Sequence, residues 1–81
     1  MVTEGAAEQL RLCPGIAGRL LRQHVTGIWP EMDDHDQEVN RRSVAEGSRV
    51  MSRWTLPTGA VIWIITEADR SATTFLLPDE Y

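Results

Sequence analysis

The chain has 81 residues, a formal net charge of −4, 42% hydrophobic residues and 25% charged residues. This length suits one small domain, and this composition excludes an intrinsically disordered chain. No apolar run approaches the roughly 20 residues that span a bilayer, and the negative charge disfavours binding of a phosphate backbone by the whole surface.

Residues 1–13 show weak helical periodicity, and we expect them to be frayed or only partly helical. The acidic start lacks the basic and apolar regions of a secretory signal peptide. Cys13 is the only cysteine, which excludes an internal disulfide and fits a reducing compartment. We therefore expect a cytoplasmic protein in which Cys13 is a half-buried thiol beside a helix start, with a reactive thiol as the less favoured alternative.

A first helix is predicted from Pro14 to about Gly27. Proline is favourable in a first helical turn, and glycine is typical just after the last one. The helical spacing is carried by four residues, namely Ile16, Leu20, Leu21 and His24. Gly15 and Gly18 weaken this helix, so we expect its stability to come from packing.

A second helix is predicted from Asp33 or Asp34, as the N-cap, to Gly47. Its first turn is acidic and its later turns carry arginines, which is the favourable order for the helix dipole. Its apolar residues are few, namely Val39, Val44 and Ala45. We expect this helix to lie on the surface of a sheet with a wide face toward water.

Three strands are predicted over residues 49–56, 60–66 and 72–77, because β-branched and aromatic residues concentrate there. Pro57-Thr58-Gly59 is typical of a hairpin connection. The turn at 67–71 is either a plain solvated turn or one locked by ion pairs of Arg70 with Glu67 and Asp69, and Asp69 also favours an Asx-turn. Short connections predict an α+β domain over residues 1–81, with two short helices followed by a three-stranded antiparallel β-meander.

The central strand is apolar on both of its faces. Val61, Trp63 and Ile65 alternate with Ile62 and Ile64. Two short helices cover only one face of such a sheet. We therefore expect the second face to be covered by the N-terminal segment, by a second copy in a homodimer, or by a partner.

No residue pattern predicts a cofactor, a metal site or a catalytic set. The cysteine and histidine spacing does not match zinc sites, and no glycine-rich phosphate loop is present. His24 is interpreted as a cation at a helix C-terminus and His35 as a solvated side chain. A nucleophile and a base brought together only by the fold remain an open alternative.

Five carboxylates cluster within eight residues: Glu31, Asp33, Asp34, Asp36 and Glu38. One interpretation is a helix N-terminus that is acidic because of the helix dipole, with a solvated face. The other is a surface that imitates the phosphates of DNA and occupies a basic groove on another protein. Taken alone, the cluster favours the first interpretation.

The block Ile-Trp-Ile-Ile-Thr-Glu-Ala-Asp-Arg-Ser at 62–71 resembles a family of small proteins carried by phages, prophages and plasmids. Residues 22–29, 56–59 and 76–81 and the acidic stretch also follow that family's pattern, whereas the first 21 residues do not. The mobile-element setting implies a role in conflict with host defence. In particular, it implies an anti-CRISPR protein against a type I surveillance complex, or a related anti-restriction protein.

Our leading hypothesis is therefore a non-catalytic inhibitor that binds a bacterial defence complex and blocks its access to DNA. The acidic cluster would meet basic residues of the target, with Trp29 and Trp54 as aromatic anchors. The alternative is a small dimeric nucleic-acid-associated regulator that uses an arginine strip, namely Arg41, Arg42, Arg49 and Arg53. A structural module of a larger phage assembly is a third possibility.

Overall fold

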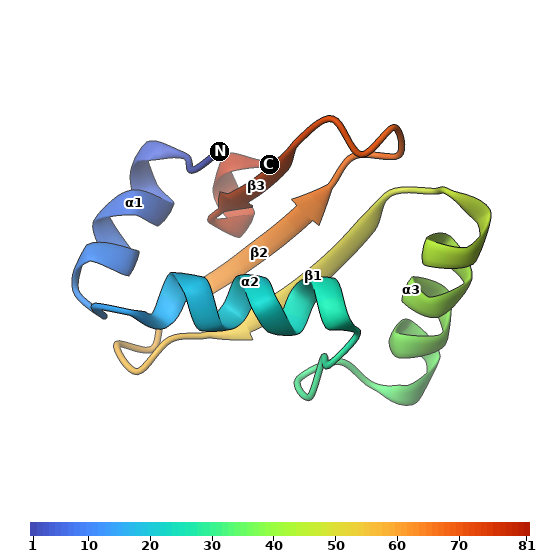
Figure 1. The fold of residues 1–81 in the computed structure, drawn as a ribbon. Helices are drawn as coiled ribbons and strands as arrows, with labels where there is room; N and C mark the ends of the chain where they lie inside the picture. The colour runs from blue at the N-terminus through green and yellow to red at the C-terminus, as the bar shows by residue number, and fades with distance from the viewer.

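The computed structural model describes residues 1–81 and has the predicted α+β class. Three α-helices come first, and a three-stranded sheet and a short 3₁₀ helix follow (Figure 1). In chain order the elements are α1 (Glu4–Arg11), α2 (Ile16–Thr26), α3 (Asp34–Glu46), β1 (Val50–Thr55), β2 (Val61–Thr66), β3 (Thr73–Leu76) and η1 (Pro78–Glu80).

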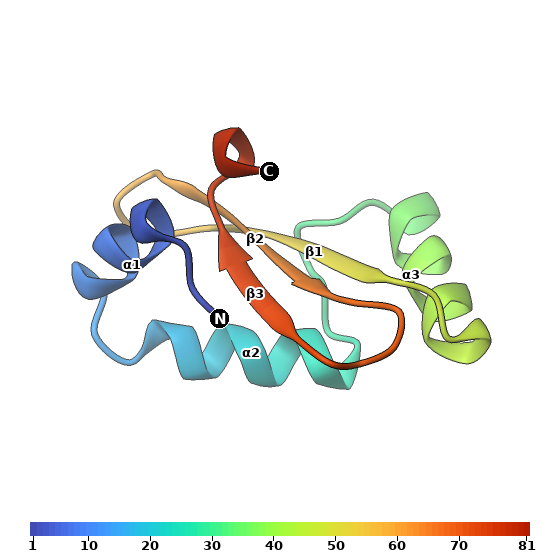
Figure 2. The same cartoon turned by 90° about the horizontal axis from the view of Figure 1, so that it is seen from above.

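The sheet is the predicted antiparallel meander, with order β1-β2-β3 and β2 at its centre. Gly59 closes the first hairpin at φ 90°, a conformation that favours glycine. On one face of the sheet, here called the inner face, Ser52, Ile62 and Ile64 are fully buried. Helix α2 lies across this face, so the main core forms between α2 and the sheet (Figures 1 and 2).

The opposite face of the sheet, here called the outer face, is covered only in part. Ile65 is buried, whereas Val61 and Trp63 are half-buried. Helix η1 lies on this side, away from α2 (Figure 2), and the Tyr81 ring meets Trp63 edge-on at 5.8 Å between centroids. The C-terminal segment thus supplies part of the cover, and a homodimer through this face stays a prediction.

Both edges of the sheet are partly covered by other parts of the chain. At β3, Thr3 donates its backbone N–H to the Phe75 carbonyl, and the Phe75 N–H donates to the Met1 carbonyl. At β1, the Asn40 side chain donates to the Met51 carbonyl at 2.7 Å and accepts from the Met51 N–H at 3.4 Å. Exposed strand edges recruit other strands, so these contacts protect the monomer against edge-to-edge pairing.

Of the two expectations for residues 1–13, frayed or only partly helical, the structure shows the second, because residues 4–11 form α1. Thr3 caps this helix by accepting a hydrogen bond from the Ala6 N–H, and Ala6 is fully buried against the core. The apolar periodicity of α1 is weak. Tertiary contacts hold this helix in place, namely the burial of Ala6 and the pairing of residues 1–3 with β3.

The predicted C-terminal ends of the longer helices and the predicted N-cap of α3 are confirmed. The predicted start of the first helix was wrong, because α2 begins at Ile16 and Pro14 lies before it. Gly27 and Gly47 end α2 and α3 in the left-handed conformation, and Asp33 caps α3. Gly15 lies outside α2 as its left-handed N-cap, so it does not weaken the helix interior. Helix α3 does not lie on a sheet face: it packs beside the β1 edge and buries only Asn40.

Candidate functional site

A groove runs between α2 and α3 on the α2 side of the sheet, and it is here called the α2–α3 groove. It consists of two adjoining pockets of about 200 and 210 Å³ that share Val25 and Val44. The first pocket is also lined by His24, Val50, Thr66 and Arg70. The second is also lined by Thr26, Gly27, Trp29 and Arg41.

The groove exists because α2 is apolar on two sides. Ile16, Leu20 and His24 point toward the sheet and are buried. On another side of α2, Leu21 and Val25 lie one turn apart and stay in solvent, with exposed fractions of 37% and 67%, and Ile28, just after the end of the helix, is 54% exposed. Across the groove, Val44 of α3 is 56% exposed. Adjacent apolar residues left in water on two helices are typical of a contact surface.

Arginines border this apolar surface, and no carboxylate lines either pocket. The Arg70 guanidinium donates to the carbonyls of Ser43, Ser48 and Glu67. It forms no ion pair with Glu67 or Asp69, so the alternative of a turn locked by ion pairs was wrong. Arg70 is the one non-glycine residue with a positive φ, 63°. Asp69 forms the predicted Asx-turn, accepting from the Ser71 N–H at 3.0 Å.

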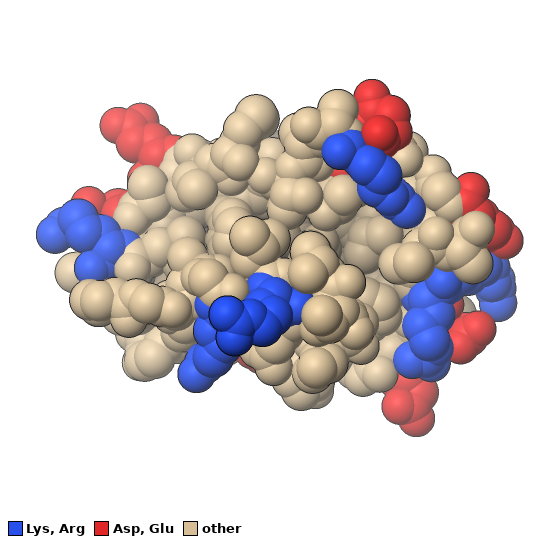
Figure 3. All heavy atoms as spheres, in the orientation of Figure 1, with Lys and Arg blue, Asp and Glu red and all other residues tan.

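Figure 3 shows this side of the molecule, with a mostly uncharged surface between α2 and α3. Cationic groups lie over α2, whereas cationic and acidic groups lie next to each other over α3 and beside the β2–β3 turn. The charged residues that line the two pockets themselves are both arginines, Arg41 and Arg70.

The floor of the groove holds a buried chain of hydrogen bonds centred on His24. His24 Nδ1 lies 2.6 Å from Ser52 Oγ, and His24 Nε2 lies 2.9 Å from Thr66 Oγ1. Trp54 Nε1 donates to Ser52 Oγ at 2.7 Å. Because the indole N–H only donates, the Ser52 hydroxyl is free to donate to Nδ1, which assigns the neutral Nε2–H form to His24.

Burial lowers the pKa of His24 to about 4, which fits this neutral form. The interpretation of His24 as a helix C-terminal cation was therefore wrong. The fold does bring a serine and a histidine together, but Ser52 is fully buried on the inner face. A hydroxyl in that position has no route to a substrate, so this pair stabilises the core.

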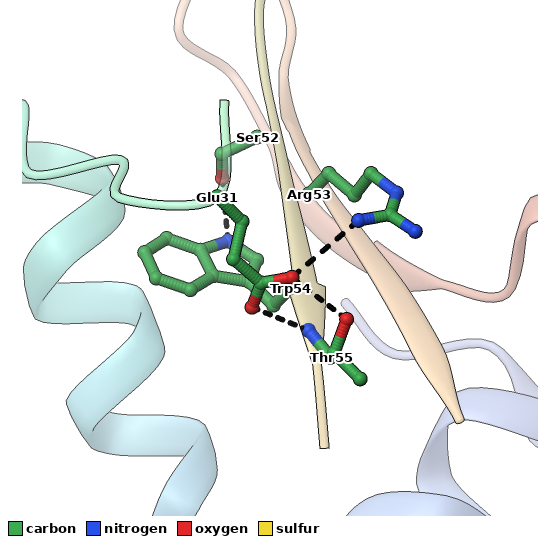
Figure 4. A network of polar contacts seen from close by, with 5 residues as sticks. All are labelled: Glu31, Ser52, Arg53, Trp54 and Thr55. Atoms are coloured by element: carbon green, nitrogen blue, oxygen red, sulfur yellow. Dashed lines mark hydrogen bonds and ion pairs between the residues drawn. The ribbon is translucent and has the colours of Figure 1, made fainter. Parts of the chain in front are cut away.

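The acidic cluster is only partly available to a partner. Glu31 turns toward β1, where it accepts from the Thr55 N–H and hydroxyl at 2.7 Å each and pairs with Arg53 at 3.4 Å (Figure 4). Asp33 accepts from the Asp36 N–H as the N-cap of α3, and Glu38 pairs with Arg41 at 3.1 Å. Only the side chains of Asp34 and Asp36 make no hydrogen bond or ion pair within the chain.

The two predicted aromatic anchors are not accessible, which corrects that expectation. Trp29 and Trp54 are each 3% exposed. Their indole N–H groups donate to the His24 carbonyl and to Ser52 Oγ, respectively. Both side chains belong to the core because the loop before α3 and the inner face of β1 direct them there.

The predicted arginine strip is divided by α3. Arg41 lines the α2–α3 groove, whereas Arg49 lines a recess on the other side of α3, beside Met51 of the outer face. Arg53 follows on the outer face of β1, and Arg42 is exposed on α3. Arg49 lies over the Tyr81 ring, 5.4 Å from its centroid, and donates to the Tyr81 hydroxyl.

The groove and the His24 network were not predicted from the sequence, although signals for both were present. Ser52 is the one polar residue among the inner-face positions of β1, and His24 follows Leu20 by four residues on the buried side of α2. Val25 follows Leu21 by four residues on a second side of α2. A helix that is apolar on two sides needs two surfaces to cover them. The sequence does not show that the sheet covers only one of these sides.

The structure holds no group of three or more histidine, cysteine, aspartate or glutamate residues placed to bind a metal ion. None of its helices combines the length and apolar content of a membrane-spanning segment. Neither a protein-family model, a curated protein nor a solved structure matches the chain.

Proposed function

We propose that this domain acts by binding another protein, without a chemical step of its own, and that the α2–α3 groove is its contact surface. The observation that carries this proposal is the exposure of Val25 and Val44, at 67% and 56%, on the two walls of one groove. Apolar residues in such positions are covered when a partner binds, and their burial supplies the main driving force of association.

The proposed partner is a bacterial defence complex, specifically a type I CRISPR surveillance complex whose access to DNA the bound domain would block. This part of the proposal rests on the resemblance of residues 62–71 to proteins of phages, prophages and plasmids. Asp34 and Asp36 would provide a second contact, because they are exposed and have no partner within the chain. They would meet basic residues that otherwise hold DNA.

A pull-down tests this proposal. Tagged protein is recovered from cells that produce a type I surveillance complex, and the captured complex is assayed for DNA binding. We expect capture of the complex and loss of its DNA binding, and replacement of both Val25 and Val44 by serine should abolish capture. Absence of capture contradicts the proposed target. Capture that survives the double replacement contradicts the proposed surface.

The acidic contact has its own test. The double variant Asp34→Asn/Asp36→Asn spares Asp33 and Glu31, which have structural roles. It should slow association at low salt and leave the circular dichroism spectrum unchanged. The control Glu46→Asn/Asp79→Asn removes the same charge elsewhere. Equal association rates for both double variants would remove the acidic cluster from the proposal.

A nucleic-acid-associated regulator is the second candidate, and one observation favours it. The outer face groups Arg49 and Arg53 with the half-exposed rings of Trp63 and Tyr81, a combination that suits stacking on single-stranded bases. In a gel shift at low salt, this candidate requires binding that the double variant Arg49→Gln/Arg53→Gln weakens. Failure of the unaltered protein to shift DNA or RNA at micromolar concentration removes it.

A further inference from the structure

We infer that the α2–α3 groove takes an acidic amphipathic helix of a partner protein, an inference that rests on the proposed role of the groove as a protein contact. Three features of the groove support it: the charge of the pocket lining, the adjacency of the two pockets and the hydrogen-bonded state of the backbone in the walls.

The charge of the pocket lining has the opposite sign to the net charge of the molecule. The chain carries a net charge of −4, yet the pockets of the groove contain Arg41 and Arg70 and no carboxylate. Arg70 hydrogen-bonds only with carbonyls and forms no ion pair, so its charge stays available to a carboxylate of a partner. Arg41 pairs with Glu38 on the surface, with more than half of each side chain exposed, and such a pair exchanges readily for a competing carboxylate. Two arginines in an otherwise uncharged groove favour acidic groups on a partner.

Two adjoining pockets suit two side chains on one face of a helix. The two pockets adjoin each other, and each has room for one or two aliphatic side chains. Apolar residues three or four positions apart on a helix lie on one side of it, about 5–6 Å from each other. Two such side chains can therefore enter the two pockets together, and acidic residues on the flanks of the same helix reach Arg41 and Arg70.

The backbone of the groove walls favours a helix over an extended segment. The groove lies between the side chains of α2 and α3, whose inner backbone groups are already hydrogen-bonded within each helix. An extended segment placed here would find no row of unpaired backbone groups in the walls. At the nearby outer edge of β1, the Asn40 and Glu31 side chains already bond with the backbone. The backbone groups of a helix are hydrogen-bonded within the helix itself, so a helix needs only side-chain contacts with the groove.

Fluorescence anisotropy with two labelled synthetic peptides tests the inference. Both peptides have leucine at helical spacing on one face, and the other face carries glutamate in the first peptide and lysine in the second. We expect micromolar binding of the glutamate peptide, weakened by added salt, and at least about tenfold weaker binding of the lysine peptide. Circular dichroism should show that the glutamate peptide gains helix when it binds.

Matched variants locate the site. Val25→Ser/Val44→Ser should weaken binding of the glutamate peptide at least about tenfold, and Arg41→Gln should weaken it severalfold. Both Val25 and Val44 are exposed, so the fold should persist. The controls are Val39→Ser, on the far side of α3, and Arg42→Gln, which has no ion-pair partner. Both controls should bind like the unaltered protein.

Contrary results separate this inference from the proposed function. Equal binding of both peptides, or no binding of either, overturns the acidic helix even if the groove variant still abolishes capture of the complex. A dimer that forms at high concentration and is lost in Val25→Ser/Val44→Ser would assign the groove to a second copy and overturn the inference. If that variant changes neither peptide binding nor capture, both proposals fail.

Discussion

At the scale of single residues, His24 connects the core to the groove. Its ring bonds with Ser52 on one side and Thr66 on the other, and the carbonyl of the same residue accepts from the Trp29 indole. Each polar atom in this buried group has a partner, which burial requires. The network fixes where α2 lies on the sheet and therefore where Val25 faces the groove.

His24 makes the stability of the domain depend on pH. The pKa of His24 is about 4 in the folded chain and ordinarily 6.5. The neutral ring therefore makes its full contribution to the free energy of unfolding above pH 6.5. As the pH falls below 6.5, the unfolded chain takes up the proton and the folded chain does not. We expect a loss of at most about 2 kcal/mol in the free energy of unfolding between pH 7 and pH 5.

Urea unfolding at pH 7, 6 and 5 checks this dependence. The variant His24→Gln should be less stable at pH 7 but lose much less stability toward pH 5. The control His35→Gln, at an exposed position of α3, should follow the unaltered protein. A slope that is the same in all three proteins would contradict the assignment to His24.

Ser52→Ala tests the buried network directly. Removal of the hydroxyl leaves the Trp54 indole N–H and His24 Nδ1 without partners in the core. We expect the free energy of unfolding to fall by about 1–3 kcal/mol, measured by urea denaturation at pH 7. Ser48→Ala, at an exposed position, should change it little. Equal effects of the two substitutions would show that the network contributes nothing.

At the scale of elements, the two helical glycines of α1 and α2 have opposite surroundings. A Cβ at Gly5 would lie 2.7 Å from both Glu80 Oε2 and Leu77 Cδ1, whereas a Cβ at Gly18 meets no atom within 4 Å. Close approach of the first turn of α1 to η1 therefore depends on glycine at position 5. At position 18 the glycine only weakens α2.

Alanine substitutions should separate these two cases. Gly18→Ala should raise the free energy of unfolding by about 0.5–1 kcal/mol, because alanine restricts the unfolded chain and fits the helix. Gly5→Ala should lower it by about 1–3 kcal/mol, because Glu80 and Leu77 must move. Thermal and urea unfolding of both variants give the comparison. Stabilisation by Gly5→Ala would mean that η1 can move away from α1 without a cost in free energy.

Helix α3 acts as cover for the β1 edge more than as a core element. Asn40, its only buried residue, bonds with the Met51 backbone, while Val39 and Val44 stay exposed on either side. This polar docking explains why a helix with so few apolar residues has a defined position. It also explains why Val44 remains available as one wall of the groove.

At the scale of the whole molecule, Glu80 joins the two ends of the chain. Its carboxylate accepts from the Thr3 hydroxyl, the Gly5 N–H and the Leu77 N–H. The hydrogen bond from Thr3, followed by that from the Leu77 backbone, holds the pKa of Glu80 below its ordinary value of 4.5. Its contribution is therefore present at neutral pH and lost as the pH falls below 4.5.

Glu80→Ala should lower the melting temperature and loosen both ends together. We expect faster hydrogen exchange at the Gly5 and Leu77 amides, measured by NMR at neutral pH, with little change in the β1–β2 hairpin. Asp79→Ala, at the neighbouring exposed position, should leave these amides unchanged. Unaltered exchange in Glu80→Ala would show that the ends are held by apolar packing alone.

Local patterns of the sequence determined the main elements of this protein. Apolar spacing predicted α2, β-branched residues predicted the three strands, and Gly27, Gly47 and Asp33 predicted helix ends. These signals act within a few residues of each other, because a cap, a turn and a strand depend on neighbouring side chains. The α+β class and the meander therefore followed from the sequence.

Tertiary structure alone decided which side chains remain exposed. Trp29 and Trp54, which were expected as accessible anchors, are buried, whereas Val25 and Val44 stay exposed. The pairing of His24 with Ser52 joins residues 28 positions apart, and no local pattern encodes such a contact. Burial depends on where distant elements meet, so the groove becomes visible only when α2 and α3 are placed on the sheet.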